Sequence, residues 1–144
     1  MEFVQGPSEI ESSIDGDGGF QKCFPAVNQA QVVNEAGVVS EIVCSSYDDY
    51  HFVNISQIGK MGTVIRVWSN KLEGVGEASY DMTTLLGKRD DPLLDVYARQ
   101  IIEKVAVHSN RPLILGIALK PEGRDAKTFQ DILNKLFEIN TWTP

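Results

Sequence analysis

The stretch GVVSEIVCSSYDDYHFVNISQIGKMGTVIRVW, residues 37–68, decides the fold of this chain. It contains three runs rich in β-branched and aromatic residues, which are typical of strands. Asp48 and Asp49 separate the first two runs, and the segment from Gly59 to Gly62 separates the last two. Short links of this kind join antiparallel neighbours, so the stretch predicts a meander with a tight two-glycine turn.

Strand-like and helical segments extend this pattern on both sides. QAQVVNE precedes the stretch, and a fifth strand is predicted at residues 80–85. Asp91 then Pro92 are typical of an N-cap and a first helical position, and His108 suits the last turn of that helix. The apolar residues between them recur on one face at helical spacing: Leu93, Leu94, Tyr97, Ala98, Ile101, Ile102 and Val105.

The last third of the chain completes the fold. RPLILGIALK, residues 111–120, is apolar on both faces and predicts a central strand. Asp125 lies near the start of a second amphipathic helix, whose apolar face comprises Phe129, Ile132, Leu133, Leu136 and Phe137. This order predicts an α+β two-layer sandwich, with a mostly antiparallel sheet of about six strands and two main helices on one face.

Two helices cannot cover both faces of such a sheet. Several strands are nevertheless apolar on both sides, and large exposed apolar patches rarely go unused. We therefore expect a partner, as a homodimer or heterodimer. The residues concerned are Val38, Val39, Ile42, Val43, Val64, Ile65, Val67, Trp68 and residues 113–119.

Charge and composition divide the chain in two and exclude some partners. Residues 1–25 hold five acidic residues and one lysine, and we expect a flexible acidic tail there, followed by one domain over residues 26–144. Its DGDGG segment, residues 15–19, resembles the start of a calcium loop but lacks the ligands at positions five and twelve. The net charge of −7 disfavours nucleic acid and anionic membranes as partners.

None of the motifs in the opening stretch carries its usual chemistry. Gly59-Lys60 lacks the first glycine and the Ser or Thr of a phosphate loop, and a strand follows it where a helix is required. Gly59-x-x-Gly62 has the spacing of a KH clamp without its flanking helices or basic surface. Cleavage before Thr63, to free a threonine nucleophile, would discard the first three strands.

Other catalytic or metal sites are equally unsupported. Cys44 lies within a strand, His51 stands beside an acidic turn, and His108 fits a helix end. No paired carboxylates or Cys/His metal cluster accompany them, so we expect a binding protein without cofactor or metal. Two cysteines without a pairing pattern, and no signal-peptide pattern, predict a cytoplasmic or also nuclear protein.

The candidate protein contacts lie in and after the glycine turn. Lysine and methionine on a rigid turn can contact a protein, although a merely solvated hairpin explains them as well. The candidate contact residues are Gly59, Lys60, Met61, Gly62, Arg66 and Trp68.

Three segments in order resemble the proteasome assembly chaperone 3 family. They are VSEIVCSSYDDYHFVNISQIGKMGTVIRV, TTLLGKRDDPLLDVYARQIIEKV and RPLILGIALK, and the resemblance runs from about Val32 to Phe137. It is sharpest at residues 57–63, at Leu85-Leu86-Gly87 and at Asp91-Pro92-Leu93. The resemblance implies a non-enzymatic α+β chaperone that pairs with a second, similar chaperone. Such a pair binds α-type subunits, promotes assembly of the 20S α-ring and leaves as the β-ring is built.

Two further expectations concern how the chain binds. The sequence ends INTWTP, without the hydrophobic-tyrosine-any tail that other proteasome partners insert between α-subunits, so docking is expected to use the folded surface. The alternative is a longin-like or roadblock-like dimeric scaffold in a trafficking or signalling complex. Such modules usually extend a sheet edge to edge, whereas an apolar second face favours face packing.

Overall fold

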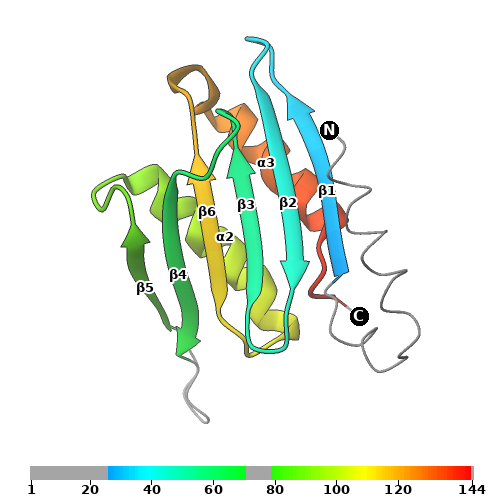
Figure 1. Cartoon of the computed structure of the whole chain (residues 1–144), viewed down its shortest axis with the longest axis vertical. Helices are drawn as coiled ribbons and strands as arrows, with labels where there is room; N and C mark the ends of the chain where they lie inside the picture. Colours follow the sequence, from blue (N-terminus) through cyan, green and yellow to red (C-terminus); the bar gives the residue numbers. More distant parts are fainter. Residues whose placement is uncertain (1–25, 71–78, 144) are drawn as a thin grey trace, which may run out of the picture.

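The computed structural model describes residues 26–70 and 79–143 of the chain. Its six strands form one sheet in the order β1-β2-β3-β6-β4-β5, and both helices lie behind this sheet in Figure 1. This arrangement confirms the predicted α+β two-layer sandwich. The predicted tail, with its DGDGG segment, lies outside the described residues. The elements are β1 (Ala26–Val33), β2 (Val39–Ser46), β3 (His51–Ser56), β4 (Thr63–Asn70), β5 (Ser79–Leu86), α2 (Pro92–His108), β6 (Leu113–Ala118), the 3-10 helix η3 (Pro121–Gly123) and α3 (Ala126–Ile139).

The predicted hairpin between β3 and β4 is wrong. β1, β2 and β3 form the expected meander, but β6 lies between β3 and β4, parallel to the first and antiparallel to the second. Residues 57–62 therefore cross from one side of β6 to the other. Neighbouring strands are about 4.8 Å apart, so a short link spans one intervening strand as readily as it closes a hairpin.

Two glycines allow this crossover to form. Gly59 has a φ of +80°, in the left-handed region that glycine adopts without strain. At Gly62 a Cβ atom would lie 2.7 Å from the carbonyl oxygen of Ile117 and 2.8 Å from the Cβ of Ala118. Gly59 therefore allows the bend of the backbone, and Gly62 allows the chain to pass close to the end of β6.

Both helices begin, and α2 ends, as the sequence predicts. Asp91 Oδ1 accepts a hydrogen bond from Leu93 N at 3.2 Å, and Asp125 Oδ2 accepts one from Thr128 N at 3.1 Å. Each carboxylate satisfies an amide that the first helical turn leaves unpaired. His108 closes α2, and the strand from residue 113 lies inside the sheet.

The core lies between the sheet and the two helices. α3 packs on β1 and β2, while α2 packs on β4, β5 and β6. Burying each large aliphatic side chain there stabilises the fold by about 1.5–3 kcal/mol. The largest fully buried apolar side chains are Ile42, Ile55, Ile65, Tyr97, Ile101, Ile102, Leu113, Leu115, Ile117, Ile132 and Leu136.

Candidate protein-binding surface

The sheet face that the helices leave uncovered is apolar at its centre. Along β6, Leu113, Leu115 and Ile117 are buried against the helices, so Ile114 between them points to the other side. The strand register places Phe52 of β3 beside Ile114 on that side. We call this uncovered side the open face. Its half-buried apolar side chains are Val43, Phe52, Val64, Trp68 and Ile114.

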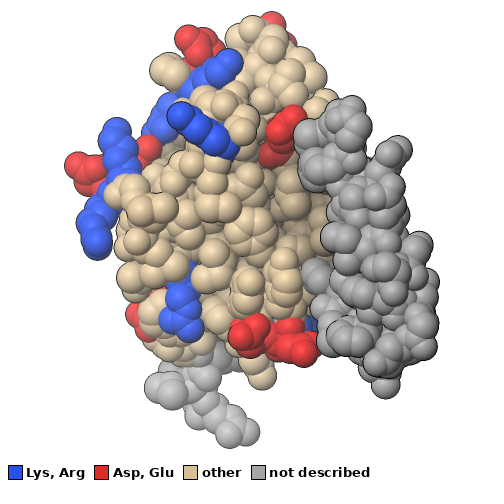
Figure 2. Space-filling view, in the orientation of Figure 1, with Lys and Arg blue, Asp and Glu red and all other residues tan. Residues whose placement is uncertain are grey.

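Exposed apolar side chains surround this centre. Val27 and Val33 of β1 are 56% and 60% exposed, and Met61 is 48% exposed. Figure 2 shows the open face with charged side chains mostly at its margins and an uncharged middle. Exposed apolar side chains on an uncovered sheet face are typical of sites of protein association.

Asp81 lies beside Trp68 in the strand register, and two further charged side chains, Arg66 and Glu41, stand among these apolar residues. The guanidinium of Arg66 lies 4.6 Å from the ring centroid of Trp68, while Glu41 Oε2 accepts a hydrogen bond from Gln31 Nε2 at 3.4 Å. Neither charge forms an ion pair with another described residue. Because burying an unpaired charge is costly, a partner that covers this face should present opposite charges to both.

Met61 and Asn54 meet over β6 at the upper part of the open face. A Cβ atom on Gly116 would lie 3.1 Å from Met61 Cγ and 2.5 Å from Asn54 Oδ1, so Gly116 leaves room for both side chains. Asn54 Oδ1 is buried without a hydrogen-bond partner. An unpaired buried oxygen costs about 1–3 kcal/mol, so a donor from a bound partner would stabilise the complex.

The six predicted contact residues divide between two surfaces. Ser56 Oγ accepts a hydrogen bond from the amide of Lys60 at 3.1 Å and donates one to its carbonyl at 2.8 Å, which fixes the bend at the end of the sheet. The six candidate residues do not form a single cluster. Met61, Arg66 and Trp68 lie on the open face, whereas Gly59, Lys60 and Gly62 belong to the crossover.

Phe52 and Asn54 also lie on the open face, and the candidate contacts drawn from the sequence did not include them. Both alternate with the fully buried His51, Val53 and Ile55 along β3. Strand alternation alone was a signal that these two share one face. Knowing that this face is the uncovered one requires the register with β6, which joins residues about 60 positions apart.

His51 is a structural side chain. It is fully buried, with Nδ1 lying 2.7 Å from Ser46 Oγ and Nε2 lying 2.8 Å from Ser109 Oγ. Burial, together with the positive charge of Arg111, lowers the pKa of His51 to about 4. The neutral imidazole thus joins β2, β3 and the end of α2, and its ring nitrogens are already bonded.

Cys44 and Thr63 are also held in the fold. Cys44 is fully buried, its Sγ lies 3.3 Å from Thr141 Oγ1, and burial raises the pKa of the thiol. A protonated, enclosed thiol is a poor nucleophile. Thr63 Oγ1 accepts a hydrogen bond from the amide of Lys88 at 3.1 Å and so ties β4 to the loop after β5.

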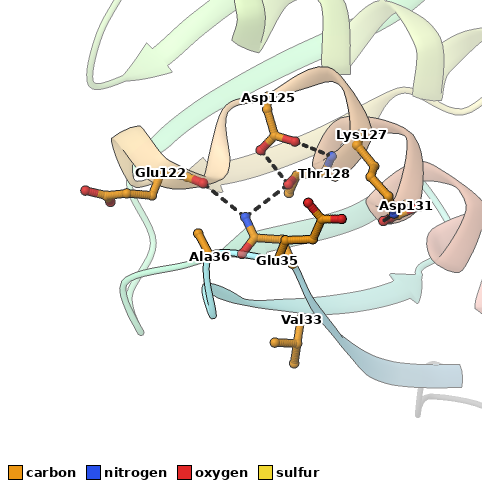
Figure 3. A pocket seen from close by; sticks show the side chains of 9 residues that line it. Val33, Glu35, Ala36, Glu122, Asp125, Lys127, Thr128 and Asp131 are labelled. Carbon is orange, nitrogen blue, oxygen red and sulfur yellow. Dashed lines mark hydrogen bonds and ion pairs between the residues drawn. The ribbon is translucent and has the colours of Figure 1, made fainter.

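A hollow of about 240 Å³ lies beside the start of α3 (Figure 3). Asn34 Nδ2 reaches across it, donating to the carbonyl of Glu122 at 3.0 Å and to Thr128 Oγ1 at 3.1 Å. Thr128 Oγ1 in turn donates to Asp125 Oδ1 at 2.6 Å. These polar groups are occupied in joining the β1–β2 turn to α3. Across residues 26–70 and 79–143, no group of three His, Cys, Asp or Glu side chains is arranged to hold a metal ion.

The fold and the open face define a class of protein, a two-layer α+β module with one apolar sheet face uncovered. No helix within the described ranges is long and apolar enough to cross a membrane. The family model described as proteasome assembly chaperone 3 matches residues 53–139. The chain belongs to the proteasome assembly chaperone 3 family.

Individual relatives agree with this assignment. Proteasome assembly chaperone 3 of Bos taurus is 32% identical over 100 residues, covering 67% of this chain and 81% of the relative. The Mus musculus protein of the same name is 30% identical over 91 residues, covering 62% and 74%. The Homo sapiens protein is 28% identical over 100 residues, covering 67% and 81%.

A solved structure shares the fold. A chain from the crystal structure of a novel chaperone complex for yeast 20S proteasome assembly superposes with a TM-score of 0.62. The alignment covers 80% of this chain and 97% of that chain at 17% sequence identity. At this identity the likeness concerns the fold alone.

Proposed function

We propose that this protein promotes assembly of the 20S proteasome α-ring without catalysing a reaction. It acts as a dimer with a second, similar chaperone, and the pair binds α-type subunits. Family membership and the fold shared with a chain of the yeast assembly complex support this proposal. The enclosed positions of Cys44 and His51 are compatible with a protein that acts by binding.

The open face is the observation that carries the proposal. Two sheets that stack face to face lie about 10 Å apart and interdigitate the side chains of their inner surfaces. The second chaperone would bury Phe52, Trp68 and Ile114 at the centre of such an interface. Stable interfaces bury about 1,200–2,000 Å² in total, and a half-buried aromatic anchor in an apolar surround is typical of their centres.

A chaperone of this kind works through binding free energy alone. By holding an α-type subunit it raises the local concentration of the correct neighbour and obstructs incorrect ones, so it requires no nucleotide, metal or other cofactor. The complex forms in the cytoplasm or nucleus, where the proteasome subunits assemble. We propose that docking uses the folded surface, to which Trp142 also belongs, since it is buried beside Phe137 and His51.

In the absence of the second chaperone, the open face is available to a second copy of this chain. We therefore expect the isolated protein to form a homodimer at high concentration and to exchange into the heterodimer when the second chaperone is added. The longin-like or roadblock-like alternative predicts edge pairing through β1 or β5, and it leaves the apolar open face unused.

The decisive experiment is a pull-down of the tagged, full-length protein followed by mass spectrometry. The proposal predicts capture of the second chaperone, free α-type subunits and early α-ring intermediates, but not of mature 26S particles. A cell line that expresses the tag alone supplies the background. Capture of mature particles alone, or of no proteasome subunit, would contradict the proposal.

A further inference from the structure

Three buried side-chain oxygens in the described part of the chain have no hydrogen-bond partner. They are Asn54 Oδ1, Ser69 Oγ and Tyr97 Oη. Tyr97 belongs to the core beneath α2, and Ser69 shares the helix side of β4 with the buried Val67. A partner on the open face meets neither of these two groups. Asn54 differs from them because it lies on the open face itself, where the second chaperone is expected to dock.

Asn54 has apolar neighbours in a row that crosses the sheet. The strand register places it beside Val43 of β2 and beside Gly116 of β6, and Val64 of β4 follows Gly116 in the same row. β3 and β6 are the two central strands of the sheet. A partner that covers the open face must therefore cover Asn54, and groups at the centre of an interface lose their contact with water.

Gly116 makes a notch beside the amide of Asn54. A Cβ atom on Gly116 would lie 2.5 Å from Asn54 Oδ1, and Met61 Cγ and Cε would lie 3.1 Å and 3.5 Å from it. The amide and the thioether thus occupy the space that a side chain on β6 would take. Met61 is 48% exposed, and its side chain is unbranched and flexible, so it can turn aside and uncover Oδ1. We call Asn54, Met61 and Gly116 the amide notch.

An enclosed oxygen without a donor makes the stability of a complex depend on its alignment. An apolar side chain laid over Asn54 Oδ1 leaves the oxygen unpaired, whereas a hydroxyl or an amide N–H satisfies it. The gain is made only in the register that brings such a donor to the notch, as with a single polar residue in an apolar coiled-coil seam. A neutral donor fits best, because one amide oxygen does not offset the desolvation of a full positive charge.

From this arrangement we propose that the amide notch determines which partner, and which register, the open face accepts. Met61 turns aside, and Asn54 Oδ1 accepts a hydrogen bond from a hydroxyl or amide side chain of the second chaperone. This inference rests on the proposed function, since it names the contact that selects the partner. The apolar residues around the notch supply the buried area, whereas Asn54 supplies the discrimination.

The test compares Asn54→Leu with the control Gln29→Met. Both variants replace an amide by an apolar side chain of similar shape, and Gln29 lies in the same row as Asn54. Gln29 is exposed on the edge strand β1, where water satisfies its amide. Each full-length variant competes with isotope-labelled wild type for a limiting amount of the second chaperone recovered in the pull-down. Native mass spectrometry measures the ratio of the two heterodimers, and thermal melting of the free chains reports their stability.

Asn54→Leu is expected to compete at least about tenfold less well than wild type, because it leaves the donor of the partner buried and unpaired. The free Asn54→Leu chain should melt at or above the temperature of wild type, since the substitution removes an enclosed unpaired oxygen. Gln29→Met should compete as wild type does. A parallel fall in melting temperature and pairing of Asn54→Leu would show a structural role and overturn the inference, as would an equal loss in Gln29→Met.

Gly116→Ala tests the notch from the neighbouring strand. Its methyl group fills the space beside Oδ1 and meets only the side-chain ends of Asn54 and Met61, so the chain should fold. We expect it to weaken pairing at least about tenfold, and the double variant to lose no more than the larger single loss, because both substitutions act on one contact. Fully additive losses, or equal competition by Asn54→Leu and wild type, would overturn the inference and leave the proposed function standing. Failure of wild type to pair with a second chaperone would instead overturn the proposed function.

Discussion

The two faces of the sheet are built from the same strands but differ in what covers them. On the helix side Ile42, Cys44 and Leu115 are fully buried. On the open face their neighbours Val43 and Ile114 remain half-buried. Successive residues of a strand point to opposite faces, so one strand supplies both the core and the proposed interface. Stability and association can therefore be changed separately by substitutions one residue apart.

The polar groups differ between the two faces as well. His51 on the helix side has both ring nitrogens bonded within the chain. On the open face, neither Arg66 nor Glu41 forms an ion pair with another described residue, and Glu41 accepts only a long hydrogen bond from Gln31. The amide oxygen of Asn54 is buried without a hydrogen-bond partner. The hydroxyl of the buried Tyr97 on the helix side also lacks a hydrogen-bond partner, so the two faces differ mainly in charge. The open face carries the charges of Arg66 and Glu41, which a bound partner can pair.

The largest expected effect comes from truncating one residue on each face of β6. Leu115→Ala should lower the free energy of unfolding by about 2–5 kcal/mol, because it leaves a cavity in the core. Ile114→Ala should lower it by only about 1 kcal/mol, since the side chain is half-exposed. Urea denaturation of the isolated chain, at a concentration where it is monomeric, measures both. Equal losses would show that the open face contributes to the core as much as the helix side does.

A second prediction concerns pH and the helix side. The folded chain holds His51 neutral down to about pH 4, whereas the unfolded chain protonates it near pH 6.5. Between these values the unfolded state binds more protons, so stability falls as the pH is lowered from 6.5 to 4, by up to about 3 kcal/mol.

Thermal melting between pH 4 and pH 7.5 measures this change. In His51→Phe, the melting temperature should lose much of its slope between pH 4 and 6.5. Introducing a second histidine by Phe52→His should not add to this slope, because a histidine on the open face titrates in contact with water. An unchanged slope in His51→Phe would contradict the buried, neutral state of this histidine.

The smallest effect is a difference in thiol reactivity. In a Cys23→Ser background, Cys44 should react with a maleimide only through opening of the core, at least about tenfold more slowly than a cysteine placed next to it by Val43→Cys. Addition of the second chaperone should slow the reaction at residue 43 and leave residue 44 unchanged. Equal rates in the free chain would refute the difference in burial between the two faces.

Much of the fold was predictable because its signals are local. Residue type and spacing identified the strands, the caps at Asp91 and Asp125 and the apolar sides of both helices. The insertion of β6 between β3 and β4 was not predictable, because strand pairing joins residues far apart in sequence. A six-residue link with two glycines fits a hairpin and a crossover equally well, so the local signal could not choose between them.

The candidate site was predicted in part for the same reason. Arg66 and Trp68 share a face because they lie two residues apart on β4, and strand alternation is enough to show it. Lys60 lies on the β3–β4 crossover, at an end of the sheet where two other loops also lie, and no sequence spacing connects those loops to it. Those loops come together through hydrogen bonds of Gln57 and Thr63, which join residues 25 to 66 positions apart in the sequence.

Ile114→Asp tests directly whether the second chaperone pairs with the open face. Native mass spectrometry of the co-expressed chains reports the heterodimer, and Gln130→Asp on the exposed side of α3 serves as the control. Pairing through the open face predicts that the Ile114→Asp chain folds but stays monomeric, because a carboxylate at the apolar centre opposes burial. The Gln130→Asp chain should pair as wild type does. A heterodimer of undiminished abundance in Ile114→Asp would contradict pairing through this face.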